Sequence, residues 1–168
     1  MNQCNLTQAQ VLEMFSYVDG KLFWRKKTSR KTVIGNEAGT IRKTDGYRQV
    51  MINYRAYRTH RLVYLYHRGW MPQIIDHINQ NTSDNRIENL RSATRAENAY
   101  NCKMRPDNTS GVKGVTWCKN KRKWVARVYA NKQCVNLGRF AEMQDAVAAV
   151  MAARQKYHGA FASEGMPQ

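Results

Sequence analysis

Apolar and polar residues alternate along this chain in short blocks, and this pattern predicts several small elements instead of a few long ones. An apolar stripe behind Thr7 predicts a helix over residues 7–17 that Thr7 can cap. The turn signal Asp19-Gly20 then leads into a strand over 21–24. A second pair of strands is expected at residues 39–43 and 47–52, joined by a turn at Asp45-Gly46.

The next blocks predict a helix followed by strand, loop, strand and helix. Residues 59–68 (THRLVYLYHR) have helical spacing, and Gly69 ends that helix. A short strand at Ile74 and Ile75 runs into Asp76-His77, and the polar residues 79–85 form a loop. Residues 87–91 return as a second strand.

A capping box marks the start of the helix that follows this second strand. Thr94 and Glu97 have the required spacing, so a helix is expected from Arg95 to about residue 104. The Asn98 side chain would then lie in the first helical turn and could face the end of the first strand.

Residues 105–111 (RPDNTSG) form the clearest linker, which predicts two domains over 1–107 and 108–168. The second domain is expected to contain strands at 112–118, 124–130 and 133–137, followed by a helix over 142–157. The fold class predicted for the whole chain is α+β.

The three later strands alternate in a way that separates two faces of a sheet. One predicted face is apolar and would cover the helix: Val115, Trp117, Trp124, Ala126, Val128, Val135 and Leu137. The other face is polar and suited to contacts with base edges: Thr116, Arg127, Tyr129 and Asn136. An ordinary solvated face is the alternative interpretation of this polar set.

The charge of the chain predicts a polyanionic partner. Among 168 residues, 28 are basic and 12 acidic, for a formal net charge of +16, and 42% are hydrophobic, which is enough for real cores. No acidic residue occurs between 108 and 141. Nucleic acid is the expected partner. From charge alone, the simplest function class is an RNA-binding protein of ribosomal type.

Neither a membrane segment nor a zinc site is expected. No run approaches the roughly 20 apolar residues that cross a bilayer, and the N-terminus lacks a signal-peptide pattern, so the chain is expected to be soluble and cytoplasmic. The four cysteines, at positions 4, 102, 118 and 134, form no CxxC pair, so we expect reduced thiols and no structural zinc.

Four side chains around the polar loop suggest metal-assisted phosphodiester hydrolysis. A carboxylate from Asp76 and an amide oxygen from Asn98 suit a hard divalent ion such as Mg²⁺. His77 can take a proton from water. Asn89 could bridge the backbone of the loop and so orient His77. An Asp-His pair alone is usually a turn feature, but its combination with DNR, ENLR and a capped helix is much rarer.

The segments DHIN, DNRIENLR and RAEN resemble the H-N-H homing endonuclease family, and THRLVYLYHRG and GYRQVMIN are similar to its upstream region. This resemblance implies a ββα-metal nuclease unit within about 74–104. It makes Asp76 the first metal ligand, His77 the general base and Asn89 the positioning residue. Asn98 occupies the final His position of the motif, a departure that favours Mg²⁺ or Mn²⁺ over Zn²⁺.

The segment from SGVKGVTW to QKYHG resembles the DNA-binding domain of Apetala-type ethylene-response factors, over about 108–160. This resemblance implies a three-stranded sheet packed on one helix, with the other sheet face in the DNA major groove. The expected phosphate contacts are basic residues that flank that face: Lys113, Lys119, Lys121, Arg122 and Lys123. Thr116, Cys118 and Tyr129 depart from the plant pattern, so the plant target sequence does not transfer.

Together these features predict a metal-dependent DNA endonuclease, with Arg86 and Arg91 holding the scissile phosphate. The resemblance implies products with a 5′-phosphate and a 3′-hydroxyl, and site-specific nicking or double-strand cleavage. We expect double-stranded DNA as partner, one divalent cation, no small-molecule cofactor, and a monomer or a DNA-induced dimer. The alternatives are a DNA-binding regulator with an inactive nuclease motif and an RNA-binding protein.

Overall fold

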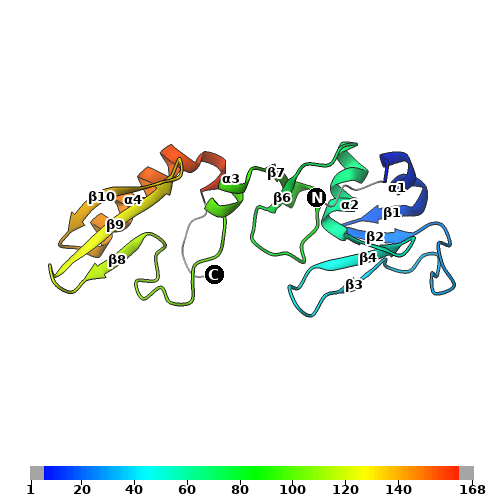
Figure 1. Ribbon diagram of the computed structural model, residues 1–168, viewed down its shortest axis with the longest axis horizontal. Helices are drawn as coiled ribbons and strands as arrows, with labels where there is room; N and C mark the ends of the chain where they lie inside the picture. The colour runs from blue at the N-terminus through cyan, green and yellow to red at the C-terminus, as the bar shows by residue number, and fades with distance from the viewer. Residues whose placement is uncertain (1–5, 163–168) are drawn as a thin grey trace. The chain divides into compact units, whose positions relative to one another are not determined.

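A computed structural model describes residues 6–162 of the chain. The fold is α+β, with helices and small antiparallel sheets, as the sequence predicts (Figure 1). The chain divides into two compact units, Met1–Ala93 and Thr94–Gln168, which are described separately below.

The N-terminal unit begins with helix α1, Gln8–Met14, followed by the hairpin of strands β1, Phe15–Val18, and β2, Lys21–Trp24. Thr7 caps α1 through a full capping box with Gln10. The helix ends at Met14, so the predicted extension to residue 17 is wrong. Phe15 instead pairs with Trp24 across the hairpin, where the ring centroids lie 4.7 Å apart. Burial of these rings overrides the helical spacing.

A three-stranded sheet follows, made of β3, Thr40–Ile41, β4, Arg48–Ile52, and β5, Arg55–Arg58, in the order β3-β4-β5. Strand β5 was not predicted from the sequence. Its turn contains Asn53 and Tyr54, both at positive φ, and lacks the glycine that usually marks such a turn.

Helix α2, Thr59–Arg68, lies at the centre of this unit and contacts α1, β2, β4 and β5 (Figure 1). Its predicted end is confirmed, since Gly69 has a φ of 75° and donates its backbone N–H to Leu65. The fully buried core side chains around α2 include Val11, Phe15, Leu22, Val50, Leu62 and Val63. This core supports the hairpin that follows.

That hairpin is formed by β6, Ile74–His77, and β7, Leu90–Ala93, which pair antiparallel. The predicted return strand therefore begins later than expected. A short 3-10 turn, η1, Ile87–Asn89, occupies its first residues, and the Asn89 side chain bonds the preceding loop.

The C-terminal unit starts with helix α3, Arg95–Tyr100, which Thr94 caps in the predicted box with Glu97. The helix ends at Tyr100, short of the expected residue 104. The compact unit also begins earlier than the predicted domain boundary after residue 107. The Tyr100 ring stacks on the His158 ring, with centroids 3.8 Å apart, so α3 packs with the C-terminal unit. The division into a nuclease region, 1–107, and a DNA-binding domain, 108–168, stays a prediction.

A three-stranded antiparallel sheet and one helix complete this unit. The strands are β8, Val115–Cys118, β9, Lys123–Ala130, and β10, Gln133–Phe140, in the order β10-β9-β8. Helix α4, Met143–His158, covers one sheet face (Figure 1) and leads into the short turn η2, Gly159–Phe161. Val115 and Ala126 pack there against Ala146 and Val150. Trp117 stays 42% exposed, with its ring edge against Trp124.

Within residues 6–162, no helix is long and apolar enough to cross a bilayer. Cys102, Cys118 and Cys134 are free thiols, and Cys4 lies outside the described residues.

Candidate active site

The β6–β7 hairpin places Asp76 and His77 next to each other in the interior of the N-terminal unit. Their exposed fractions are 6% and 4%. Because adjacent strand residues point to opposite faces, the two side chains meet different surroundings. Asp76 pairs across the hairpin with Arg91, whereas His77 lies near two aromatic rings and the polar loop.

Arg91 holds the Asp76 carboxylate. Its Nε and a terminal guanidinium nitrogen both lie 2.8 Å from Asp76 Oδ2, and the two residues are direct cross-strand partners. Arg91 was expected to hold the scissile phosphate, but in the structure its guanidinium forms an ion pair with the candidate ligand carboxylate. This role depends on strand register, which the sequence pattern did not reveal.

Asn85 determines which nitrogen of His77 can act as a base. His77 Nε2 lies 3.1 Å from Asn85 Oδ1, and an amide oxygen only accepts hydrogen bonds, so Nε2 carries the proton. The neutral imidazole then presents Nδ1 as its basic nitrogen. Burial lowers the pKa of His77 below its usual 6.5, against the opposing effects of Asn85, Asp76 and Asp84. His77 is therefore neutral at neutral pH, as a proton acceptor must be.

His60 packs against His77 from helix α2. The two rings meet edge-on with centroids 5.2 Å apart, and Tyr47 lies 5.1 Å from His60 and 5.9 Å from His77. His60 is only 7% exposed. Burial, followed by the electrostatic influence of His77, Arg61 and Arg58, lowers the pKa of His60 to about 3. His60 thus supports the His77 ring as a neutral packing partner.

This burial of His60 predicts that the protein loses stability in mild acid. The unfolded chain binds a proton at His60 near pH 6.5, but the folded chain does not until about pH 3, so stability falls as pH drops through this window. Between pH 7.5 and 5 we expect a loss of about 2 kcal/mol from this residue. Urea denaturation of wild type and His60→Phe would measure it. The variant should show a shallower pH dependence, and the exposed control His67→Phe should change it less, because burial lowers the pKa of His67 as well but His67 is much more exposed to solvent than His60.

Asn89 fixes the loop between the two strands of the hairpin. Its Oδ1 accepts from the Asn79 backbone N–H at 2.9 Å, and its Nδ2 donates to Asn79 Oδ1 and to the Asp84 carbonyl oxygen. The buried amide thus bridges both ends of the loop. Its contribution to catalysis stays a prediction.

The β1–β2 hairpin supports the segment that carries Asn85. Tyr17 accepts the Ile87 backbone N–H at its hydroxyl, 3.2 Å away. Gly20 has a φ of 81°, and a Cβ atom there would lie 2.8 Å from the backbone nitrogen of Arg86. Only glycine fits this close approach without a shift. The sequence marked Gly20 only as part of a turn and did not single out Tyr17, because the loop that both residues contact lies far along the chain.

Arg86 is bound to Asp84 within the same loop. Its Nε and a terminal nitrogen lie 2.9 and 2.8 Å from the two Asp84 carboxylate oxygens. The Arg86 hydrogen bond, the largest influence, helps to lower the pKa of Asp84 to about 2, so the pair stays ionised at neutral pH. For the phosphate contact predicted for Arg86, its exposed guanidinium would have to donate to a phosphate in addition to Asp84.

The predicted ligand Asn98 lies on α3 of the C-terminal unit, where its side chain is exposed and its backbone N–H donates to Thr94. Asn101, three residues further along, is 4% exposed at the end of the same helix. The pairing of Asn98 with Asp76 at one ion therefore stays a prediction from the motif.

The residues of the hairpin fit a hard divalent ion by their chemistry. Both Arg91 contacts go to Asp76 Oδ2, and a carboxylate can bind such an ion through one oxygen. Among residues 6–162 no three His, Cys, Asp or Glu side chains cluster as a metal site. The predicted ligand set differs from such a cluster, because its second member is an amide.

The polar face of the C-terminal sheet has the predicted composition. Arg127 and Asn136 are direct cross-strand partners, and the Thr116 and Tyr129 side chains are exposed with them. A bulge between Asn136 and Gly138 shifts the register of β10 and brings Arg139 opposite Val125, onto this same face. Arg139 was not predicted on this face, because simple alternation along the strand does not include the bulge.

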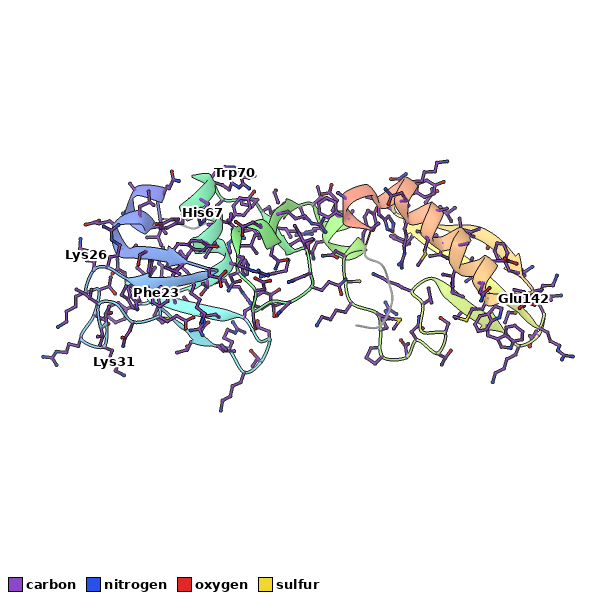
Figure 2. The ribbon with its side chains drawn as sticks, turned by 180° about the vertical axis from the view of Figure 1, so that it is seen from behind. Phe23, Lys26, Lys31, His67, Trp70 and Glu142 are labelled. Atoms are coloured by element: carbon purple, nitrogen blue, oxygen red, sulfur yellow. The ribbon has the colours of Figure 1, made fainter. Side chains whose placement is uncertain are left out.

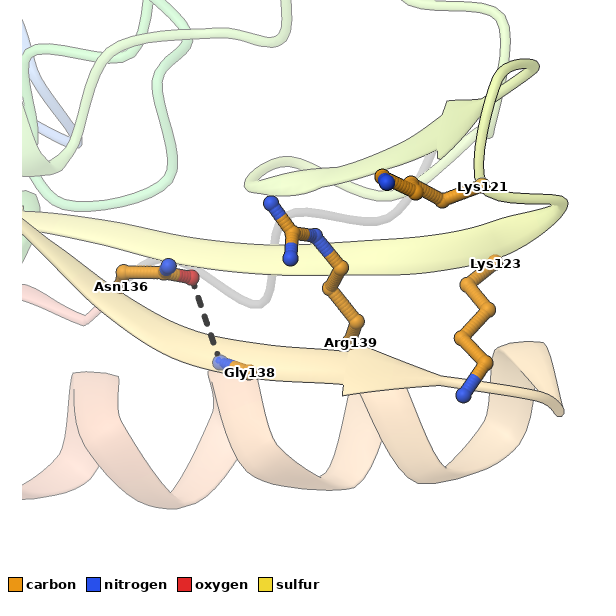
Figure 3. A pocket seen from close by; sticks show the side chains of 5 residues that line it. All are labelled: Lys121, Lys123, Asn136, Gly138 and Arg139. Carbon is orange, nitrogen blue, oxygen red and sulfur yellow. Dashed lines mark hydrogen bonds between the residues drawn. The ribbon is translucent and has the colours of Figure 1, made fainter.

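Arg139 lines a shallow pocket with basic and polar neighbours: Lys121, Lys123, Asn136 and Gly138. Figure 3 shows the Arg139 side chain extending from β10 across β9, and the Asn136 side chain accepting the Gly138 N–H at 3.3 Å. No acidic side chain lines this pocket. Its chemistry suits an anion such as a phosphate group.

Two other basic groups have neighbours that the sequence did not reveal. Lys113 does not project from the sheet, since its Nζ donates to the Tyr100 and Cys102 carbonyls at 3.1 and 2.7 Å. In the basic loop after β2, Lys26 bonds Glu13 at 2.6 Å, and Figure 2 shows Lys26 and Lys31 extending outward there.

The comparisons with known proteins agree with this site. Residues 57–100 match the family model for HNH endonuclease, a range that includes α2, the whole β6–β7 hairpin and α3. The chain is 36% identical to Protein 3.8 of Escherichia phage T7 over 111 residues, which cover 65% of this chain and 91% of that protein. No solved structure matches the chain. The chain therefore belongs to the family of phage T7 Protein 3.8 and carries an HNH endonuclease domain at residues 57–100.

Proposed function

We propose that this protein is a metal-dependent DNA endonuclease that hydrolyses phosphodiester bonds. The observation that carries the proposal is the β6–β7 hairpin, which lies inside the HNH match and presents Asp76 beside His77. The hydrogen bond from His77 Nε2 to Asn85 supports it, because this bond leaves Nδ1 as a base.

In the proposed reaction, His77 Nδ1 takes a proton from a water molecule. The water oxygen forms a bond to phosphorus, and the bond from phosphorus to the leaving 3′ oxygen breaks, which gives a 5′-phosphate and a 3′-hydroxyl. Asn85 keeps the imidazole in the required tautomer, and Asn89 fixes the loop that carries Asn85. General base catalysis of this kind contributes typically about 100- to 10,000-fold to the rate.

Asp76 and Asn98 are the residues that would hold one divalent ion, Mg²⁺ or Mn²⁺. A bound ion of this kind stabilises the charge on the reacting phosphate and on the leaving oxygen. Arg91 orients the Asp76 carboxylate for this task. Oxygen ligands from a carboxylate and an amide favour these hard cations.

The polar face of the C-terminal sheet is proposed to bind double-stranded DNA. Thr116, Arg127, Tyr129 and Asn136 would contact base edges, and Arg139 joins them from the bulged strand. Lys119, Lys121, Arg122 and Lys123, around the β8–β9 turn, would meet phosphates. The formal net charge of +16 supports a polyanionic partner. One active site in each monomer would cut one strand, so a double-strand break requires a dimer or two successive events.

The Arg127→Ala variant tests the role of this sheet. We expect DNA affinity to fall by roughly 5- to 100-fold, together with a reduced salt slope or a weaker site preference, because an Arg on a reading face contacts bases or phosphates. Gel-shift titrations at several salt concentrations would measure these effects. Lys156→Ala, on α4, is the matched control and should retain affinity. Equal affinity and specificity in wild type and Arg127→Ala would contradict DNA binding by this face.

The proposed activity itself is tested by incubating the full chain with supercoiled plasmid, with Mg²⁺, with Mn²⁺ or with a chelator. We expect relaxed or linear plasmid to form only when an ion is present. DNA binding without ion-dependent cleavage would instead support a DNA-binding regulator with an inactive motif. Preference for RNA over duplex DNA in competition would support an RNA-binding protein.

A further inference from the structure

Helix α3 is short and has no hydrophobic core contact of its own. It spans Arg95–Tyr100, and none of its residues is buried. An isolated helix of this length is unstable in water, so contacts at its ends must keep it ordered. The Thr94 capping box provides such a contact at the N-terminus.

Lys113 supplies the contact at the C-terminal end. Its Nζ donates to the Tyr100 carbonyl at 3.1 Å and to the Cys102 carbonyl at 2.7 Å, and Cys102 Sγ lies 3.4 Å away. The last carbonyls of a helix lack partners within the helix and carry partial negative charge, so a lysine ammonium there is stabilising. Arg154 of α4, only 7% exposed, in turn donates to the Lys113 carbonyl at 3.0 Å.

An aromatic stack connects the same end of α3 to the DNA-binding sheet. The Tyr100 and His158 rings are nearly parallel, at 7°, with centroids 3.8 Å apart. His158 is the last residue of α4, and its Nε2 donates to the backbone carbonyl of Tyr129 on β9 at 3.0 Å. The Tyr129 ring lies on the polar sheet face. The stack and the Lys113 contacts therefore both attach α3 to the C-terminal unit.

We propose that Lys113 and the Tyr100–His158 stack are positioning residues for Asn98. They hold α3, the helix that carries Asn98, on the rest of the C-terminal unit. The inference rests on the proposed function, in which Asn98 binds the ion. It also replaces the phosphate contact first assigned to Lys113, because the ammonium already serves acceptors at the end of α3.

The test compares Lys113→Met with wild type in the full chain, with Lys132→Met as the matched control in an exposed turn. Three properties are measured. Mn²⁺ binding is followed by electron paramagnetic resonance, and plasmid nicking is measured as a function of Mn²⁺ concentration. DNA binding is measured in the presence of a chelator. We expect Lys113→Met to bind Mn²⁺ about 10- to 100-fold more weakly, the range typical when a residue that orients a ligand is removed. DNA affinity without ion should stay unchanged, and Lys113→Arg should restore part of the ion affinity.

Amide hydrogen exchange gives a second readout that does not require activity. The Asn98 and Asn101 amides donate within α3, to Thr94 and Glu97, so their exchange should accelerate in Lys113→Met and in Tyr100→Ala. If Lys113→Met does not fold, Tyr100→Ala decides the question by the same measurements.

Three results would overturn the inference. Unchanged Mn²⁺ affinity together with unchanged amide exchange would show that Lys113 and the Tyr100–His158 stack do not position α3. A loss of DNA affinity and a salt slope lowered by about one would show that Lys113 contacts phosphate after all. A wild-type protein without ion-dependent nicking would contradict the proposed function. This result is distinguishable from a failure of the present inference, in which wild type nicks DNA but the variants do not differ from it.

Discussion

The His77→Ala variant is expected to lose DNA nicking while retaining DNA binding. Removing the imidazole removes the proton acceptor, so the rate should fall by about 100- to 10,000-fold. Plasmid nicking at saturating Mn²⁺ or Mg²⁺ would measure the loss, and a gel shift with a chelator would measure binding. The exposed His67, which packs edge-on against Tyr17, provides the matched control His67→Ala. Nicking by His77→Ala at the wild-type rate would show that another group is the base.

The pH dependence of wild-type nicking provides an independent check on this assignment. Burial lowers the pKa of His77 below 6.5, so the base should stay deprotonated to a lower pH than an exposed histidine. The acidic limb of the rate profile should therefore lie below pH 6.5. A limb at higher pH would argue against His77 as the titrating group.

The Asp76→Ala variant is expected to lose both ion-dependent nicking and stability. The carboxylate is the predicted ligand, and its removal also breaks the ion pair with Arg91, whose side chain is 17% exposed. Breaking a buried ion pair by removing one member costs about 3–5 kcal/mol, and the partial exposure of Arg91 favours the lower end of this range. Urea denaturation would measure the stability, and the plasmid assay the activity.

The double variant Asp76→Ala/Arg91→Met separates the two roles of Asp76. Replacing Arg91 with an apolar side chain as well should recover most of the lost stability, because exchanging both members of a buried ion pair for apolar groups is often neutral. Nicking should not recover, since the ligand is still missing. Recovery of both properties would show that Asp76 has a structural role alone, and recovery of neither would show that Arg91 is needed in its own right.

The local elements of the fold were predictable where one short segment contains the whole signal. Examples are the capping boxes at Thr7 and Thr94, the end of α2 at Gly69, and the hairpin of β9 and β10 with its turn at Asn131. The failures had two causes. Phe15 leaves the helix for a strand because its ring packs on Trp24, a contact outside the segment itself. Strand β5 was missed because the turn before it, at Asn53 and Tyr54, contains no glycine.

Within the candidate site, the sequence by itself determined which chemical groups are available and their order: Asp76 beside His77, the polar loop and the capped helix with Asn98. Neighbouring positions in a strand or in the first turn of a helix follow from local geometry, so a short motif is enough to establish them. Tertiary structure alone decided the partners of these groups.

Arg91 lies on Asp76 because of cross-strand register, and Asn85 bonds His77 because the loop folds back under Asn89. His60 supports His77 from a separate helix. Arg139 joins the polar sheet face through a bulge, and Lys113 turns to the end of α3. Hydrogen-bond partners and buried neighbours depend on distances between segments far apart in the chain, and these distances are created only when the core packs.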